Sequence, residues 1–367
     1  MNDLPLKTKK VTLRDVAARA GIDKATASRA LSGKGSSAPK TRELVLRAAQ
    51  ELGFQPDLYA QRLANGRSNR EVALFAGTDL GVATQLIWAL THGLDDRGYE
   101  VEMHDIPQYV SHVLERQVGL VNKVCRQRPA AIIAGWISTS AVLEELRQFM
   151  AEGGVVVSYG WPIPLPCDQV IFDSEKRIFQ AAQHLLEMGH RKIGMCFHGL
   201  ISTEENGDLH GFKRALEQYS VPLRREWLFA GGKYEIGGAK FAAEFLQWEE
   251  KPTALCIIND DSASAFINVL AQNGVSVPND VSVISFDDTP TARYAYVPLT
   301  SASYPLQEIA QHVVELTSSR LEGFQGALRR VEVQSHLIER QSCAPPCSAL
   351  GRPTERKSHT ACATSEE

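Results

Sequence analysis

The stretch that decides the fold of the first part of this chain is VTLRDVAARAGIDKATASRAL, residues Val11–Leu31. A first helix is predicted over 13–20, because its apolar residues recur at i, i+3, i+4 and i+7. These residues are Leu13, Val16, Ala17 and Ala20. A second, short helix rich in small residues is predicted over 24–31. Two helices joined by a tight turn are typical of a helix-turn-helix, whose second helix enters the major groove of DNA.

The ends of both helices carry the residues that helix ends require. Thr12 stands at the first N-cap position, and Asp15 follows three residues later, a capping-box spacing with Asp in place of the usual Glu. Gly21 stands where the first helix must end, because glycine adopts the left-handed backbone of that position without a steric cost. Asp23 caps the second helix.

A third helix is predicted over 40–52, after Pro39, with Leu44, Ala48 and Leu52 as its apolar stripe. The polar side chains around the turn are of the types that bind DNA. Arg29 can pair bidentately with guanine, and hydroxyl and basic groups suit phosphate contacts. The exposed face of the second helix offers Lys24, Ala25, Thr26, Ser28 and Arg29, and the predicted phosphate contacts are Thr26, Ser28, Lys40, Thr41 and Arg42. The alternative is a small helical bundle whose charges are merely solvated.

The charge of the chain is distributed unevenly. Residues 1–70 hold 14 Lys and Arg against 6 Asp and Glu, whereas the rest holds 25 against 37, within a net charge of −4. A basic head on an acidic body indicates that the head is the part that binds a polyanion.

Other classes of protein are disfavoured by what the sequence lacks. No apolar stretch is long enough to span a membrane, and the basic, polar N-terminus predicts no secretory signal, so we expect a cytoplasmic protein without a membrane partner. The seven cysteines show no CxxC pair or nearby histidine at ligand spacing, so we expect no metal site. No GxGxxG, P-loop or GxSxG motif occurs in the core, so no cofactor and no catalytic residues are predicted.

After Asn69 short apolar strands alternate with amphipathic helices. Strands are predicted at Glu71–Ala76, Ala254–Ile258, Val281–Phe286 and five positions between, with helices such as Glu175–Met188 and Leu306–Leu321. Such alternation requires parallel sheets with helices on their faces, and more than 250 residues of it indicate two sheets. The last residues are polar and rich in proline, and are predicted to be disordered.

The head resembles the DNA-binding domain of the lactose/galactose repressor (LacI/GalR) family. The VTxxDVAxxAG opening, the ATxSR segment, KTRE at the third helix and the AxxLA segment stand in register over some sixty residues. The resemblance implies that Lys24, Ala25 and Arg29 read bases, while Thr12, Thr26, Ser28 and Thr41 hold the DNA backbone.

The segment Leu58–Asn65 resembles the hinge helix of that family, which folds on operator binding. The resemblance implies that Leu63 wedges into the minor groove at the centre of the operator and kinks it. Two departures from the family pattern occur here. Asp57 replaces the usual Asn, which places a carboxylate near phosphate, and Ala27 replaces a common Val.

The core resembles the same family and, through it, the periplasmic sugar-binding fold. The segments that carry the resemblance are AAQHLLEMGHRKIG (181–194), HGFKRAL (210–216), IINDDSA (257–263), GVSVPNDVSVISFDD (274–288) and PLTSASYP (298–305). It implies two lobes with a ligand between them, near the carboxyl ends of the strands. The predicted organisation is a helix-turn-helix domain over 1–57, a hinge and linker over 58–70, a two-lobed effector-binding and dimerisation core over 71–341, and a disordered tail over 342–367.

The effector-binding residues follow by position. The resemblance implies that Asp287 binds sugar hydroxyls, that Asn259 is a second polar group at a strand end, and that Tyr234 stacks on the ligand ring. Asp208 stands where family members often carry an Arg that grips ligand oxygens, so a donor has become an acceptor. The loop Gly77–Thr84 also departs from the family pattern. We therefore hypothesise that the pocket prefers a polyol or an amine-bearing ligand to an acidic one.

The resemblance implies a transcriptional regulator, a repressor in the commonest case, that binds double-stranded operator DNA as a homodimer and responds to a sugar-like small-molecule effector. Two other functions stay open. An enzyme with an appended DNA-binding head requires a reactive set of residues in the cleft, and an architectural DNA binder responds to no ligand.

Overall fold

The computed structural model describes residues 11–32, 38–52, 54, 70–77, 82–106, 113–137, 139–198, 207–231 and 234–346. The chain divides into two compact units, of which the first holds residues 1–69 together with the short segment 122–129 and the second holds residues 70–121 and 130–367. Each unit is described by itself below.

The described residues of the head form three helices, α1 (Leu13–Ala20), α2 (Lys24–Ser32) and α3 (Pro39–Leu52). The predicted capping box of α1 is present, since Thr12 and Asp15 hydrogen-bond each other's backbone N–H groups. Gly21 ends α1 with φ of 66°, as the sequence predicts. The helices enclose a core of small apolar side chains, which are Val16, Ala17, Ala27, Ala30, Val45, Ala48 and Ala49.

The predicted apolar stripe of α3 is confirmed at Ala48 and Leu52, which belong to or pack against the head core, and is wrong at Leu44. Leu44 is 55% exposed, whereas Val45, Ala48 and Ala49 are buried against α1 and α2. Small side chains fit there because the three helices are short and their axes lie close together. Arg19 on α1 pairs with Glu51 on α3 at 2.5 Å and closes one side of this bundle.

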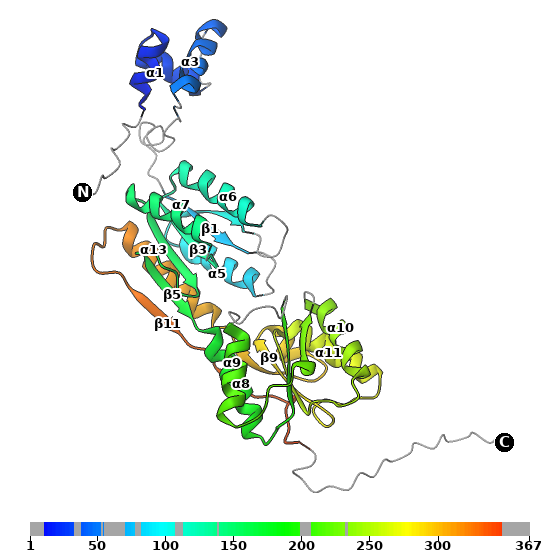
Figure 1. Cartoon of the computed structure of the whole chain (residues 1–367). Coiled ribbons are helices and arrows are strands. Elements are labelled where there is room, and N and C mark those ends of the chain that lie inside the picture. Colours follow the sequence, from blue (N-terminus) through cyan, green and yellow to red (C-terminus); the bar gives the residue numbers. More distant parts are fainter. Residues whose placement is uncertain are drawn as a thin grey trace, which may run out of the picture. The chain divides into compact units, whose positions relative to one another are not determined.

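The core holds two six-stranded sheets, which confirms the predicted pair of parallel sheets (Figure 1). The sheet of the first lobe has the order β11-β5-β4-β3-β1-β2 and is parallel throughout. Its strands are β1 (Glu71–Ala76), β2 (Glu100–Asp105), β3 (Ala131–Gly135), β4 (Val155–Gly160), β5 (Asp168–Phe172) and β11 (Arg330–Val333). Its helices are α5 (Ala83–Asp95), α6 (Val113–Gln127), α7 (Ser140–Ala151) and α13 (Leu306–Leu321).

The second lobe has the order β12-β10-β9-β8-β6-β7, in which only β12 runs antiparallel to its neighbour among the strands described. Its strands are β6 (Ile193–His198), β7 (Leu228–Gly231), β8 (Ala254–Ile257), β9 (Ser282–Asp287), β10 (Thr300–Ser303) and β12 (Leu337–Ile338). Its helices are α8 (Ser174–Glu187), α9 (Gly207–Gln218), α10 (Tyr234–Gln247), α11 (Asp260–Gln272) and α12 (Pro290–Tyr294), with a short 3-10 turn at Arg225–Trp227.

The chain passes between the two lobes three times, from β5 to α8, from β10 to α13 and from β11 to β12. Within the first lobe, the connection from α13 to β11 is fastened by Asp168 at the start of β5, whose carboxylate accepts hydrogen bonds from Arg320 (2.8 Å) and Arg329 (2.7 Å). Asp168 is fully buried, so these two guanidinium groups supply the partners that a buried carboxylate needs.

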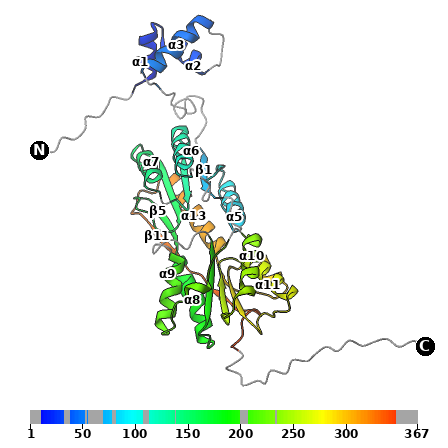
Figure 2. The ribbon, with the colours of Figure 1, turned by 45° about the vertical axis from the view of Figure 1, so that its right-hand side comes forward.

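Alternate residues of the second sheet face different helix pairs. Met195, Phe197 and Ile284 pack against α8 and α9, whereas Leu255 and Val283 pack against α10 and α11. Figure 2 shows these two helix pairs on opposite sides of the sheet. Near-continuous apolar strands are expected of a parallel sheet that is buried on both faces.

Each helix pair crosses at a glycine. A Cβ on Gly211 of α9 would lie 2.2 Å from the carbonyl oxygen of Glu175 on α8, and a Cβ on Gly238 of α10 would lie 2.1 Å from that of Ser262 on α11. Only glycine permits helices to approach this closely. The two crossings bring the N-terminal turns of these helices to the carboxyl end of the second sheet, where β6, β8 and β9 finish.

The ordered core extends past the boundary predicted after Gln341. Ser342 is fully buried, and its hydroxyl donates to the carbonyl of Val283 (2.5 Å) and accepts from the N–H of Thr300 (2.8 Å). The carbonyl of Ala344 lies 2.9 Å from His190 Nε2. The segment 342–346 therefore packs on the second lobe, and the remainder of the predicted tail lies outside the described residues.

The glycine crossing is tested by Gly211→Ala, which should lower the free energy of unfolding of the core by about 2 kcal/mol because α8 and α9 must move apart. The matched control is Gly119→Ala on the exposed face of α6, where no atom lies within 4 Å of the new Cβ. Gly119→Ala should raise the free energy of unfolding of the core by ~0.5–1 kcal/mol, because alanine has a higher helix propensity than glycine. Urea unfolding of both variants measures the difference, and equal effects would contradict the crossing argument.

Candidate functional site

One face of α2 is free of packing and carries the residues predicted to read DNA. Lys24, Ala25 and Arg29 are exposed, whereas Ala27 and Ala30 on the opposite face are fully buried. The buried face of α2 therefore packs in the core of the head, while its polar face stays exposed to solvent.

The start of α2 is held by Asp23. Its carboxylate accepts from the N–H of Thr26 (2.9 Å) and from the Thr26 hydroxyl (2.6 Å), and these bonds lower the pKa of Asp23. Arg29 Nη2 donates to the same hydroxyl oxygen at 3.2 Å. Capping thus orders the first turn of α2 and holds the Arg29 side chain along the exposed face, which reduces the entropy lost when the helix docks.

The other predicted DNA-binding residues lie around this face or outside the description. Lys40 and Arg42 are exposed and Thr41 is half-buried on the first turn of α3, while Ser28 is half-buried on α2. The Thr12 hydroxyl donates to Asp15 Oδ2 at 2.7 Å. The predicted contact of Thr12 with the DNA backbone therefore competes with Asp15 for this hydroxyl group. Asp57 and Leu63 lie outside the described residues.

In the core, Asp287 lies at the end of β9 and forms an ion pair with Arg177 of α8, with 2.9 Å between Asp287 Oδ1 and Arg177 Nη1. Asp287 has φ of 103° and Asp288 has φ of 52°, which are backbone conformations that L residues rarely adopt. Burial raises the pKa of Asp287, and Arg177 opposes that rise. Arg177 was missed by the sequence analysis, although it stands four residues before Ala181 on the buried stripe of α8.

Asp208 lies in the first turn of α9, beside the same arginine. Burial raises the pKa of Asp208, while the charge of Arg177 and a hydrogen bond from Ser174 lower it. The Gly211 crossing explains this placement, because it presses the first turns of α8 and α9 together. Asp208, Arg177 and Asp287 therefore form one electrostatic group.

Asn259 and Tyr234 lie on the other helix pair. Asn259 is buried and its side-chain oxygen caps α11, accepting from the N–H of Ser262 at 2.7 Å. Tyr234 begins α10 with φ of 49°, and its carbonyl accepts from the Ser262 hydroxyl at 2.9 Å. The structure thus assigns Asn259 a capping role, and ligand contact by either residue stays a prediction.

Asp260 fastens the turn that carries Asp287. Its carboxylate accepts from the hydroxyls of Ser285 (2.6 Å) and Ser301 (2.8 Å) and from the N–H (2.7 Å) and hydroxyl (2.8 Å) of Thr289. Burial, with a smaller effect from Asp287, raises the pKa of Asp260 to about 6. Asp260 is a positioning residue that the sequence analysis did not single out.

Aromatic side chains stand next to this charged group at the lobe junction. The Tyr304 ring, on the second passage between lobes, lies 4.6 Å from that of Phe172 and 5.9 Å from that of Trp136, measured between centroids. The guanidinium of Arg177 lies over Phe172 at 5.1 Å and over Phe286 at 5.2 Å. Both lobes therefore contribute to the same junction.

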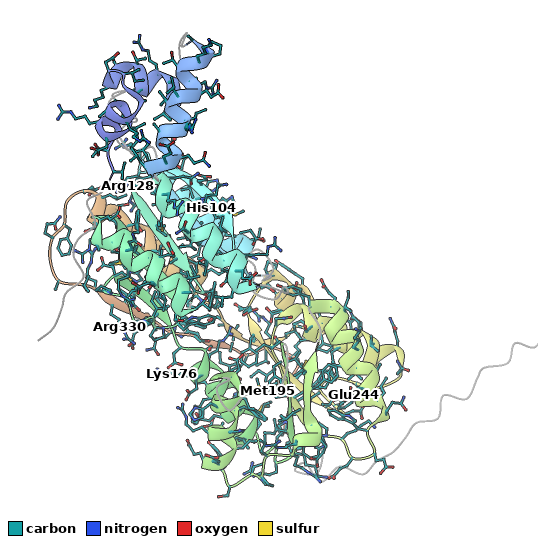
Figure 3. The ribbon with its side chains drawn as sticks, turned by 45° about the horizontal axis from the view of Figure 1, so that its top comes forward. His104, Arg128, Lys176, Met195, Glu244 and Arg330 are labelled. Carbon is teal, nitrogen blue, oxygen red and sulfur yellow. The ribbon has the colours of Figure 1, made fainter. Side chains whose placement is uncertain are left out.

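A cavity of about 300 Å³ opens at one side of this junction. It is lined by Trp161, Phe172, the first turn of α8 including Arg177, and the chain from Arg330 to Ser335. Figure 3 labels Lys176 and Arg330, which come from α8 and β11. None of the four predicted effector-binding residues lines this cavity, so it adjoins the predicted site through Arg177.

Two kinds of site find no support within the residues that the structure describes. No group of three or more His, Cys, Asp or Glu side chains is arranged to hold a metal ion. Likewise, no described helix combines the length and the apolar character needed to cross a membrane.

Comparison with known protein families places both parts of the chain. Residues 12–57 match the model of bacterial regulatory proteins of the lacI family, and residues 182–343 match that of the periplasmic binding protein-like domain. The chain therefore carries a lacI-family helix-turn-helix head and a periplasmic binding protein-like domain in its core. It is a DNA-binding transcriptional regulator whose core is α/β and two-lobed.

Relatives of this regulator match over nearly their whole length. The transcriptional repressor PurR of Vibrio vulnificus is 27% identical over 338 residues, which are 90% of this chain and 98% of the relative. The transcriptional regulator DegA of Bacillus subtilis is 27% identical and is covered to 99%.

Solved structures share the architecture. A complex of the transcriptional regulator CelR with cellobiose aligns with a TM-score of 0.63 at 25% identity, covering 91% of this chain and all of that one. The lac repressor dimer bound to operator and an anti-inducer aligns with a TM-score of 0.64 at 22% identity, covering 92% of this chain, and this likeness concerns the fold alone.

The open face of α2 predicts that Arg29→Ala weakens specific DNA binding by about 1–3 kcal/mol and relaxes the preference at one base pair. The matched control is Arg47→Ala on α3, whose side chain is 80% exposed and pairs with Glu51. Fluorescence anisotropy with a bound duplex and its single-base variants measures both. Equal losses in the two variants would contradict a base-reading role for Arg29.

The Asp260 carboxyl predicts a pH effect of definite sign. Its folded-state pKa of about 6 exceeds the ordinary value of 3.8, so the folded chain keeps a proton that the unfolded chain has lost. The stabilisation is complete below the ordinary pKa and is lost as pH rises through about 6. Relative to wild type, Asp260→Asn should therefore gain up to about 3 kcal/mol between pH 4 and pH 7. Urea unfolding at both pH values checks this, and a pH-independent difference would contradict it.

Proposed function

We propose that this regulator binds a pseudo-palindromic operator as a homodimer, represses transcription there, and changes its operator affinity when a sugar or related polyol binds between the two lobes of the core. The relatives support this proposal, since several are named repressors, CelR was solved with cellobiose, and a LacI family regulator of Enterococcus faecium was solved with ribose. The open polar face of α2 supports the DNA-binding part.

The observation that carries the effector proposal is the convergence of polar and aromatic side chains at the lobe junction. Asp287 and Asp208 supply acceptors, Arg177 supplies donors, and Phe172 and Trp136 supply flat apolar surfaces. Sugars offer both a ring of hydroxyl groups and apolar C–H faces, so this mixture suits them. Tyr234 and Asn259 would complete the site from the second helix pair.

The three passages between lobes give the effector a means of acting at a distance. A ligand that contacts both lobes favours one angle between them, because it binds that arrangement more tightly than others. In the proposed mechanism the first lobe transmits this preference to the hinge segment 58–65. Leu63 would then enter the minor groove only in one of the two states.

The proposal includes no catalytic step and places the protein in the cytoplasm, where its operator would be. Asp260 and Asn259 are engaged in a hydrogen-bonded turn and a helix cap, and Arg177 and Asp287 are engaged in an ion pair. These arrangements position groups for recognition rather than generating a nucleophile.

Reciprocal coupling tests the proposal. If a ligand changes the operator Kd by some factor, bound operator must change the ligand Kd by the same factor. Anisotropy and calorimetry on the full chain, with D-ribose, cellobiose or D-glucitol as ligand, measure the two factors. Asp287→Ala should abolish both, with Asp96→Ala on the surface of the first lobe as the control. A ligand that binds without moving the operator Kd would contradict the proposal.

A further inference from the structure

Arg177 is the most constrained charged side chain at the lobe junction. Its guanidinium lies over the ring of Phe172 at 5.1 Å and over that of Phe286 at 5.2 Å, and Nη1 is bonded to Asp287. The residue is 8% exposed, so water does not replace these partners. A planar guanidinium suits this slot better than an ammonium group does, because it stacks on aromatic faces and donates in fixed directions.

Asp208 on α9 stands where the family resemblance implies an arginine. The buried arginine beside it, Arg177, comes from α8. The Gly211 crossing holds the first turns of the two helices together, so Arg177 and Asp208 interact electrostatically. The junction therefore keeps its guanidinium, supplied from a different helix.

Two buried polar atoms beside this group lack hydrogen-bond partners among the described residues. They are Nε of Arg177 and the hydroxyl of Tyr304. Tyr304 is 5% exposed, and Arg177 and Asp287 both act on its hydroxyl electrostatically. Buried groups of this kind are usually bonded, so they mark a place where ligand atoms complete the pairing.

We propose that Arg177 is a specificity-determining residue of the effector site, which replaces the arginine expected at position 208 and selects uncharged or amine-bearing sugars and polyols over sugar phosphates and sugar acids. This deepens, and rests on, the proposed effector function. A hydroxyl oxygen of the ligand accepts from Arg177 Nε, while ligand hydroxyl or ammonium groups donate to Asp287 or Asp208.

The selection against acids follows from the local charge balance. One guanidinium faces two carboxylates, Asp208 and Asp287, and a third carboxylate, Asp260, stands behind them. An anionic ligand would meet a cation that is already paired and would be repelled by the carboxylates, whereas a neutral or cationic ligand would not.

The test is calorimetric titration of the full-length protein with two panels. The first holds D-glucose, D-ribose, cellobiose, D-glucitol and D-glucosamine, and the second holds D-glucose 6-phosphate and D-gluconate. At least one member of the first panel should bind and none of the second should. Arg177→Gln should weaken that binding by about tenfold or more, since a charge-assisted hydrogen bond is lost.

Rescue separates ligand contact from a general structural role. The double variant Arg177→Gln/Asp208→Arg returns a guanidinium to the site from α9 and should recover most of the lost affinity. Arg177→Lys keeps the charge without the planar fork and should recover less. Lys176→Gln is the matched control, because Lys176 bonds to Gln334 instead (2.8 Å), and it should leave ligand affinity unchanged.

Several results would overturn the inference. They are unchanged ligand affinity in Arg177→Gln, loss without rescue in the double variant, tight binding of the phosphate or the acid, and absence of binding by the whole first panel. Operator binding by the same samples reports on the proposed function separately, because a failure confined to ligand selection leaves DNA recognition intact.

Discussion

The close approach of two helix pairs in the second lobe is the constraint on which the effector site depends. Gly211 and Gly238 leave no room for a Cβ against the backbone of the neighbouring helix. Because the helices touch there, their first turns converge at the carboxyl end of the sheet. This brings Arg177 and Asp208 together on one helix pair, while Asn259 caps α11 on the other. A side chain larger than that of glycine at either crossing would push the two helices apart, and it would thereby separate the charged side chains that they carry.

The site that results is built around paired charges rather than around a single reactive group. Arg177 is held by two phenylalanine rings and an aspartate, and Asp260 fixes the strained turn on which that aspartate stands. Such preorganisation lowers the entropy cost of ligand binding, and it also makes the site sensitive to the angle between the lobes. The aromatic residues Phe172 and Trp136 belong to the first lobe, so the proposed ligand site would lie at the lobe junction.

Much of the fold follows from the sequence. The helices of the head, the capping box and Gly21 are local features, and local features are encoded by neighbouring residues. For the same reason, the predicted core helices Glu175–Met188 and Leu306–Leu321 lie within one residue of α8 and α13 at either end. The strands β7, β10, β11 and β12 were not predicted, because they hold two to four residues and sequences such as TSAS and RVEV lack apolar character. Their place is fixed by pairing with distant strands.

The site was predictable only in part. Asp287 was found from the family pattern, but the role of Arg177 depends on which face of α8 is buried and on where α9 crosses it. A charged residue on an apolar stripe was the available signal, and Asp260, on the stripe of α11 with Ala263 and Ile267, gave the same signal. The most direct test of the account is selection of bound duplexes from a random pool by the full-length protein. The account predicts enrichment of a pseudo-palindrome with two half-sites, and a pool that stays random at moderate salt would contradict it.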